Sequence, residues 1–141
     1  MAIDAQGHVW IAGEGQSTTE LSTGGTPVSG SPFAGGGQCP SCANGISIDG
    51  AGNIWISDGP FEPPFEVSIT ELNNSGAALS PSTGFRTSLL SYPFGIAIDG
   101  SGNVWVADNG GLDMIEFVGA AVPVVTPLAA GVANKTLGTR P

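Results

Sequence analysis

The chain has 141 residues, is rich in Gly and Pro, and carries a net charge of −9 with only three Lys or Arg residues. This shortage of basic groups argues against nucleic acid or an anionic membrane as a partner, because both are bound through cationic side chains. The positive mean hydropathy, without the roughly 18-residue apolar run that a membrane-spanning helix needs, indicates a folded domain rather than a disordered or transmembrane segment.

One sequence pattern occurs three times along the chain. Residues 1–11, 46–56 and 96–106 each contain a short apolar segment, an Asp, a Gly-containing turn and a second apolar segment with a Trp. A repeat of about 40–50 residues built from short strands is typical of β-propeller blades. The pattern therefore predicts an all-β fold of three repeated units.

Each repeat is expected to contain four antiparallel strands. The two apolar segments form the first hairpin, and Asp, Gly and Asn supply the chemistry of its turn. The third strands are expected at 17–22, 67–73 and 113–118, and the fourth strands at 26–29, 77–80 and 122–128. The first two strands show little polar alternation, which indicates sheets that are covered on both faces.

The third repeat has the clearest form, Gly-Ile-Ala-Ile-Asp and then Gly-Asn-Val-Trp-Val-Ala-Asp, at 95–108. This pattern resembles the NHL-repeat and virginiamycin-B-lyase-like β-propeller superfamily. The resemblance implies one domain, 1–141, with four-stranded blades at about 1–44, 45–94 and 95–130 and a tail at 131–141. The superfamily includes binding proteins, lactonase-like hydrolases and antibiotic-opening lyases, so the resemblance predicts the fold more sharply than the function.

Three blades leave two sheet faces uncovered, because a propeller closes with about four to eight blades. The chain begins inside a repeat and ends close to where a fourth repeat would start. We therefore expect a C2 homodimer, in which blade three of each chain packs against blade one of the other and six blades form a ring. A fragment of a longer six-bladed chain and a designed propeller with no activity beyond assembly are alternatives.

The residues that recur in the repeats favour structural roles. Trp10, Trp55 and Trp105 are expected to fill the space between blades. The Asp at the start of each hairpin turn is expected to hold that turn, and the Glu that recurs in each third strand is expected to be a hydrogen-bonded or solvated strand residue. His8 replaces the Asn of the other two turns, and the sequence indicates no partner that would make it a general base.

The two cysteines, Cys39 and Cys42, lie in a Gly-rich loop without a helical pattern after it. A local disulfide is the favoured interpretation, ahead of free thiols or a redox motif. A zinc site on these thiols would need two more ligands, and His8 is the only histidine, which argues against metal here. The disulfide and the scarcity of Lys favour a bacterial-type exported protein, periplasmic or extracellular.

The predicted ligand site lies on the face formed by the loops that vary in length between repeats, since binding surfaces commonly use variable loops over a constant scaffold. Exposed aromatics beside acids suit carbohydrate, peptide or small-molecule ligands. The candidate ligand-binding residues are Phe61, Glu62, Phe65, Glu66, Arg86 and Tyr92.

The favoured function is a non-enzymatic binding or scaffold propeller that needs no cofactor. The alternative is a divalent-metal-dependent lactonase- or lyase-like enzyme, as the resemblance implies, with Asp58, Asp108 and Asn109 as candidate metal ligands. Calcium is the ion considered for such a site, although the Asp-containing turns lack the alternating acids of a calcium-binding loop.

Overall fold

The computed structural model describes residues 1–13, 17–38, 43–59 and 67–124. This part of the chain contains no helix with the length and apolar character of a membrane span. Its strands are β1 (Ala2–Ile3), β2 (Val9–Gly13), β3 (Ser17–Leu21), β4 (Ala43–Ile48), β5 (Ile54–Asp58), β6 (Ser68–Leu72), β7 (Pro93–Ile98), β8 (Val104–Asp108) and β9 (Asp113–Phe117).

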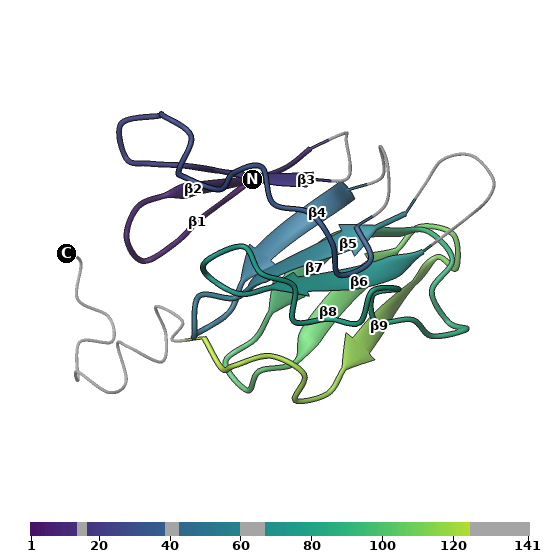
Figure 1. Cartoon of the computed structure of the whole chain (residues 1–141). Helices are drawn as coiled ribbons and strands as arrows, with labels where there is room; N and C mark the ends of the chain where they lie inside the picture. Colours follow the sequence, from purple (N-terminus) through teal and green to yellow (C-terminus); the bar gives the residue numbers. More distant parts are fainter. Residues whose placement is uncertain (14–16, 39–42, 60–66, 125–141) are drawn as a thin grey trace, which may run out of the picture.

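The strands form three antiparallel sheets, which we call blades 1, 2 and 3: β1–β2–β3, β4–β5–β6 and β7–β8–β9. Each blade is a meander in which the middle strand pairs with its neighbours on both sides, and the three blades lie one after another in chain order (Figure 1). The prediction of an all-β chain of three repeated antiparallel units is confirmed.

The prediction of four strands in each blade is wrong for the described residues, because each sheet has three. In blades 1 and 2 the expected fourth strand is reduced to a single β-bridge, Leu21 with Pro27 and Leu72 with Ala78. Pro27 has no amide hydrogen to continue a ladder. In blade 2 the amides of Leu79 and Ser80 both donate to the Glu71 carbonyl, so the pairing loses its register.

The segment 118–124, which follows β9, does not return to blade 3 as a fourth strand. It crosses the hairpin turns of blades 2 and 3 instead: the amide of Val122 donates to Asp49 Oδ2 at 3.1 Å, and its carbonyl accepts from Gly50 at 3.0 Å. The Ala121 amide donates to the Gly102 carbonyl at 2.9 Å. Polar groups of the two turns therefore take the hydrogen bonds that a fourth strand would have made, and residues 125–128 lie outside the described residues.

The same arrangement of Asp and Trp supports each first hairpin. In blade 3, Asp99 Oδ1 accepts hydrogen bonds from the backbone amides of Ser101 and Asn103, while Oδ2 accepts from Asn103 Nδ2 and from Trp105 Nε1 at 2.9 and 3.0 Å. Asp49 and Asp4 hold their turns and their tryptophans in the same manner. The structural role expected for these aspartates is confirmed.

Each blade has two different faces. One face presents the tryptophan of the middle strand, and we call it the Trp face. The other presents branched aliphatic side chains, and we call it the aliphatic face. In blade 2 the aliphatic face contains Ile46, Ile48, Ile54, Ile56 and Leu72.

The two inner junctions use these faces in the same order. Trp10 is fully buried in one cluster with the aliphatic face of blade 2, and Trp55 is buried in a second cluster with Val104 and Val106 of blade 3. A Trp face thus meets an aliphatic face at both junctions. These two tryptophans fill the space between blades, as the sequence predicts.

The two outer faces have no neighbour within the described chain. Blade 1 presents an aliphatic face on which Met1 is 86% exposed and Ile3 67% exposed. Blade 3 presents a Trp face on which Met114 is 60% exposed and Trp105 is only partly buried. The ends of the stack therefore leave one face of each kind open.

Candidate functional site

Asp58 and Asp108 occupy equivalent positions at the ends of β5 and β8, and both are buried. Asp58 Oδ2 accepts a hydrogen bond from Thr70 Oγ1 at 2.8 Å. The Asp108 carboxylate accepts from the backbone amides of Ser91, Tyr92 and Gly111, with the shortest bond, 2.6 Å, from Tyr92. These carboxylates therefore hold a neighbouring strand and loop, and their metal role stays a prediction.

A hollow of about 500 Å³ lies on blade 3 beside Asp108. Its wall is largely apolar and includes the exposed side chains of Phe94 and Leu112, and Asn109, the third predicted metal ligand, also lines it. The residues that line the hollow are Phe94, Gly95, Ala107, Asp108, Asn109, Leu112 and Asp113. Because Gly95 and Ala107 belong to the open Trp face, the hollow lies where blade 3 has no neighbour.

Two predicted ligand-binding residues lie in the segment between blades 2 and 3. Arg86 is exposed, and its Nε donates to the Thr83 carbonyl at 2.7 Å. Tyr92 is partly buried beside Phe94, with ring centroids 6.2 Å apart, and burial raises the pKa of its phenol. The remaining predicted ligand residues, Phe61, Glu62, Phe65 and Glu66, and the predicted disulfide, Cys39–Cys42, lie outside the described residues.

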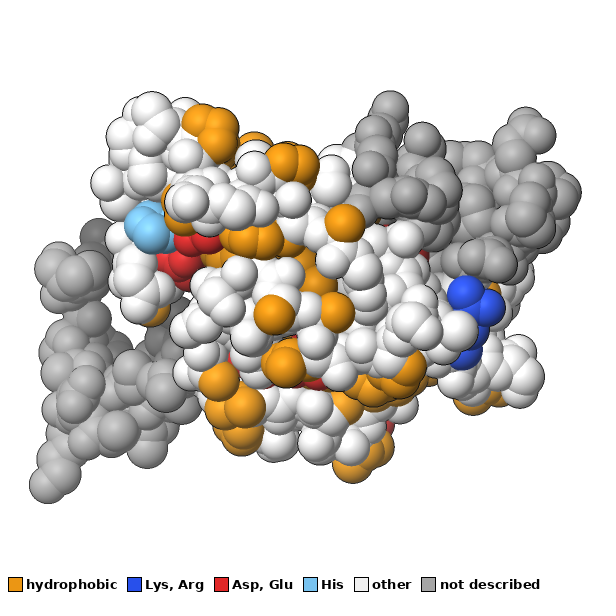
Figure 2. Space-filling view, viewed as in Figure 1, with side chains coloured by type: hydrophobic (Ala, Val, Ile, Leu, Met, Phe, Trp, Pro, Cys, Tyr) orange, Lys and Arg blue, Asp and Glu red, His pale blue; other side chains and the backbone are white. Residues whose placement is uncertain are grey.

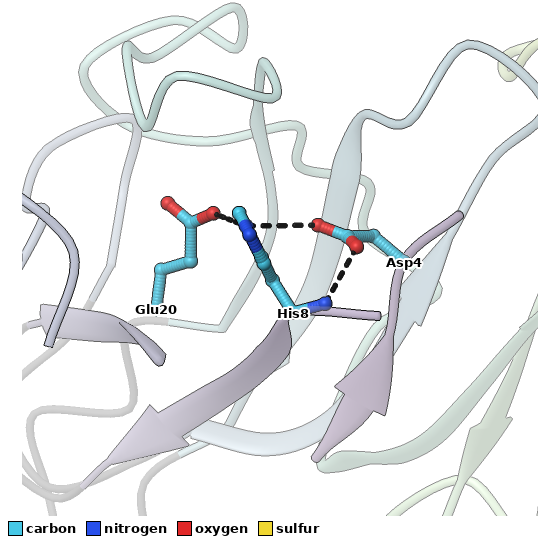
Figure 3. A group of neighbouring side chains, drawn as sticks. All are labelled: Asp4, His8 and Glu20. Atoms are coloured by element: carbon cyan, nitrogen blue, oxygen red, sulfur yellow. Dashed lines mark hydrogen bonds and ion pairs between the residues drawn. The ribbon is translucent and has the colours of Figure 1, made fainter. Parts of the chain in front are cut away.

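A different group of side chains gathers at the opposite end of the strands of blade 1, where the turn of the first hairpin meets β3. His8 Nδ1 lies 2.6 Å from Glu20 Oε1 and 3.9 Å from Asp4 Oδ2 (Figure 3). The imidazole lies between the two carboxylates, and it reaches the surface beside acidic side chains (Figure 2). Among the described residues, this is the one group of three His, Cys, Asp or Glu side chains with ligand atoms within 4.8 Å of one another.

The three side chains differ in exposure and in their other partners. The His8 side chain is 31% exposed, whereas those of Asp4 and Glu20 are 9% and 7% exposed. Burial opposes ionisation of Asp4, but hydrogen bonds from Trp10 Nε1 and from the amides of His8 and Gln6 outweigh it and lower the Asp4 pKa. Asp4 is therefore an ionised carboxylate held in a fixed orientation.

The sequence pattern does not by itself bring these three residues together, because Glu20 lies on a different strand from His8 and their contact depends on register. Glu20 is the direct cross-strand partner of Trp10, and His8 precedes Trp10 by two positions, which places His8 diagonally across from Glu20 on the same face. Applying this register to the recurring Trp and Glu would have identified a partner for His8.

Blade 2 has the equivalent group of side chains without a histidine. There Asn53 replaces His8 and donates from Nδ2 to Asp49 Oδ2 at 3.1 Å. Burial, and then the negative charge of Asp49, raise the pKa of Glu71, the counterpart of Glu20. The paired carboxylates thus recur in blade 2, but blade 1 alone adds an imidazole between them.

Comparisons with protein-family models and with curated protein sequences find no match. Among solved structures, the chain is similar to one described as "Streptogramin B lyase structure", with a TM-score of 0.62 and 18% sequence identity. The similarity covers 92% of this chain and 41% of that one, so this chain spans less than half of the length of that six-bladed propeller. At this identity the likeness shows the fold, a β-propeller-like repeat architecture.

Proposed function

We propose that the chain is a non-enzymatic binding or scaffold module of the NHL-repeat and virginiamycin-B-lyase-like type, and that a second copy completes its ring as a C2 homodimer. The observation that carries this proposal is the pair of open faces. Blade 1 exposes an aliphatic face and blade 3 exposes a Trp face, and these are the two kinds of face that meet at both inner junctions.

Sheet positions that are covered in the middle blade show what each open face is suited to contact. Ile54 of blade 2 is buried in one cluster with Trp10 and Ile48 packs against that cluster, whereas their counterparts in blade 1, Val9 and Ile3, have no blade against them. Trp105 stands at the position of Trp10 and Trp55. A second copy would therefore supply each open face with the surface that its counterparts already contact.

The size of the related fold supports two copies rather than three. The chain matches 41% of a six-bladed propeller, and three blades are half of such a ring. Two half-rings related by a two-fold axis close with two identical junctions and leave no face uncovered. The hollow on blade 3 would then lie at the new junction, where the second copy would cover its apolar wall. We propose that a ligand binds beside Asp108 and Asn109, at the end of β8.

The experiment that tests this proposal is the mass of the untagged chain in solution, measured by light scattering over a dilution series. A dimer has twice the 14.0 kDa of the chain. A mass that stays at that of one chain, with the tryptophans in a folded environment by fluorescence, would overturn the dimer. A larger, concentration-dependent series of masses would indicate open head-to-tail polymers, and it would equally contradict the closed ring.

A further inference from the structure

We propose that Asp4, His8 and Glu20 form a binding site for a divalent transition-metal ion, with Zn²⁺ as the best-suited ion. The site is formed by the turn of the first hairpin and by β3 of blade 1, away from the hollow and from both predicted metal carboxylates at the other end of the strands. It belongs to this blade alone, because the equivalent turns have Asn53 and Asn103 in place of the histidine.

The distances fit a small ion with N and O ligands. Zinc bonds of about 2.0–2.2 Å to imidazole and carboxylate place neighbouring tetrahedral ligand atoms about 3.3 Å apart. His8 Nδ1 lies 2.6 Å from Glu20 Oε1 and 3.9 Å from Asp4 Oδ2, so the spacings lie on either side of this value. A small rotation of the Glu20 carboxylate would lengthen the shorter distance, from His8 Nδ1 to Glu20 Oε1, towards this value.

The hydrogen bonds around Asp4 prepare it as a ligand. Its Oδ1 is engaged by the amides of Gln6 and His8, and its Oδ2 accepts from Trp10 Nε1 at 2.9 Å while facing the imidazole. Outer hydrogen bonds of this kind hold a coordinating carboxylate in one orientation and are common around metal ligands. The carboxylate therefore needs no rearrangement of the turn to bind a cation.

Charge and access favour a transition metal over calcium or magnesium. An imidazole nitrogen suits Zn²⁺, Ni²⁺ or Co²⁺, whereas Ca²⁺ and Mg²⁺ take oxygen ligands almost entirely. Two carboxylates and a neutral imidazole would neutralise a divalent ion. The His8 side chain is 31% exposed, so an ion can enter from solvent and keep water in its remaining position.

The test is zinc titration of the untagged chain by calorimetry, with Cys39 and Cys42 both replaced by Ser so that thiols do not contribute. We expect one zinc ion per chain, a d–d absorption band with Co²⁺, and affinity for Ca²⁺ lower by at least about tenfold. His8→Asn recreates the turn of the other two blades and should fold normally, with zinc affinity reduced about tenfold or more.

Glu20→Gln and Glu71→Gln form the matched pair of controls. Glu20→Gln should lose zinc affinity, while Glu71→Gln alters the equivalent position of a blade without histidine and should leave it unchanged. Absence of zinc binding by the parent chain, or equal affinity of His8→Asn, would overturn the proposal and leave the group as an ion pair. Neither result depends on whether the chain dimerises.

Discussion

Asp99 shows how a single carboxylate can hold a turn and a tryptophan side chain at once. The hydrogen bond from Trp105 Nε1, together with those from the Asn103 and Ser101 amides, lowers the Asp99 pKa from 3.8 to about 2. Because the folded state binds the proton less well than the unfolded state, the ionised carboxylate stabilises the fold. This stabilisation is present above pH 3.8 and is lost as the pH falls through about 2.

We expect Asp99→Asn to lower the free energy of unfolding at neutral pH, with a smaller difference from the parent chain as the pH falls from 3.8 towards about 2. Urea denaturation followed by tryptophan fluorescence over a pH series measures this difference. Trp105→Phe removes the most important donor and should weaken the same acid dependence. If the free energies of unfolding of Asp99→Asn and the parent chain differed by the same amount at every pH, the ionised Asp99 carboxylate would not be the group that stabilises the fold.

The residue-level predictions from sequence succeeded where one residue acts within its own turn. The Asp of each hairpin contacts amides two and four positions later, so its role follows from local spacing. His8 and Glu20 are on neighbouring strands, and their contact depends on register. The role of Asp108 depends on the path of the 91–92 backbone, which the sequence does not specify.

At the scale of elements, the close approach of neighbouring blades depends on glycine. A Cβ atom at Gly45 would lie 2.5 Å from the Phe94 carbonyl oxygen and 2.9 Å from Ser57 Oγ. Ser57 Oγ itself donates to that carbonyl at 2.7 Å, and Asn44 Nδ2 donates to the Pro93 carbonyl at 2.8 Å. This polar contact between the starts of β4 and β7 thus has no room for a side chain.

Gly45→Ala should therefore separate blades 2 and 3 locally and lower the free energy of unfolding by about 1–3 kcal/mol, as overpacking commonly does. Gly24→Ala is the control, since Gly24 lies in an exposed turn away from both open faces and its added Cβ would meet only Ser22 Oγ at 3.8 Å. We expect a change below about 0.5 kcal/mol for this control. The urea midpoint of each variant measures its change in stability. Similar decreases in the free energy of unfolding for the two variants would mean that crowding at Gly45 is unimportant.

The first three strands of each blade were predictable because each is a short segment with apolar or β-branched residues that is bounded by a turn. The fourth strand was not predictable, because other groups take the hydrogen bonds that would have paired it with the third strand. The Glu20 and Glu71 amides donate to the hydroxyls of Ser31 and Ser80. After β9, the Val122 amide donates to the carboxylate of Asp49, which belongs to blade 2. Such contacts over long sequence separations leave no periodic signal in the chain.

At the scale of the whole molecule, the repeats form a stack with a direction. Blades 1 and 2 present their Trp faces to the next blade, and blades 2 and 3 present their aliphatic faces to the previous one, so the stack ends in two unlike faces. Closing the stack on itself is the arrangement that removes both ends. A two-copy ring would satisfy this polarity, because each open face would meet the kind of face that its counterparts already contact.

Ile3 and Leu89 provide a matched test of the ring, since their exposed fractions in the single chain are 67% and 66%. Ile3 belongs to the open aliphatic face, whereas Leu89 lies in the segment between blades 2 and 3. Ile3→Glu would bury a charge at the new junction and should weaken the dimer by about tenfold or more, equivalent to about 1.4 kcal/mol. Leu89→Glu should leave the dimer mass unchanged.

Light scattering over a dilution series measures both variants, and the urea midpoint at low concentration establishes that each chain still folds. If both glutamates reduced the mass equally, dissociation would reflect added negative charge on a chain of net charge −9 rather than contact at the open face. If only Ile3→Glu dissociates the dimer, the aliphatic face of blade 1 lies within the contact between copies. Because a closed ring uses this face twice, both junctions would weaken together and the product would be a single folded chain rather than an open dimer.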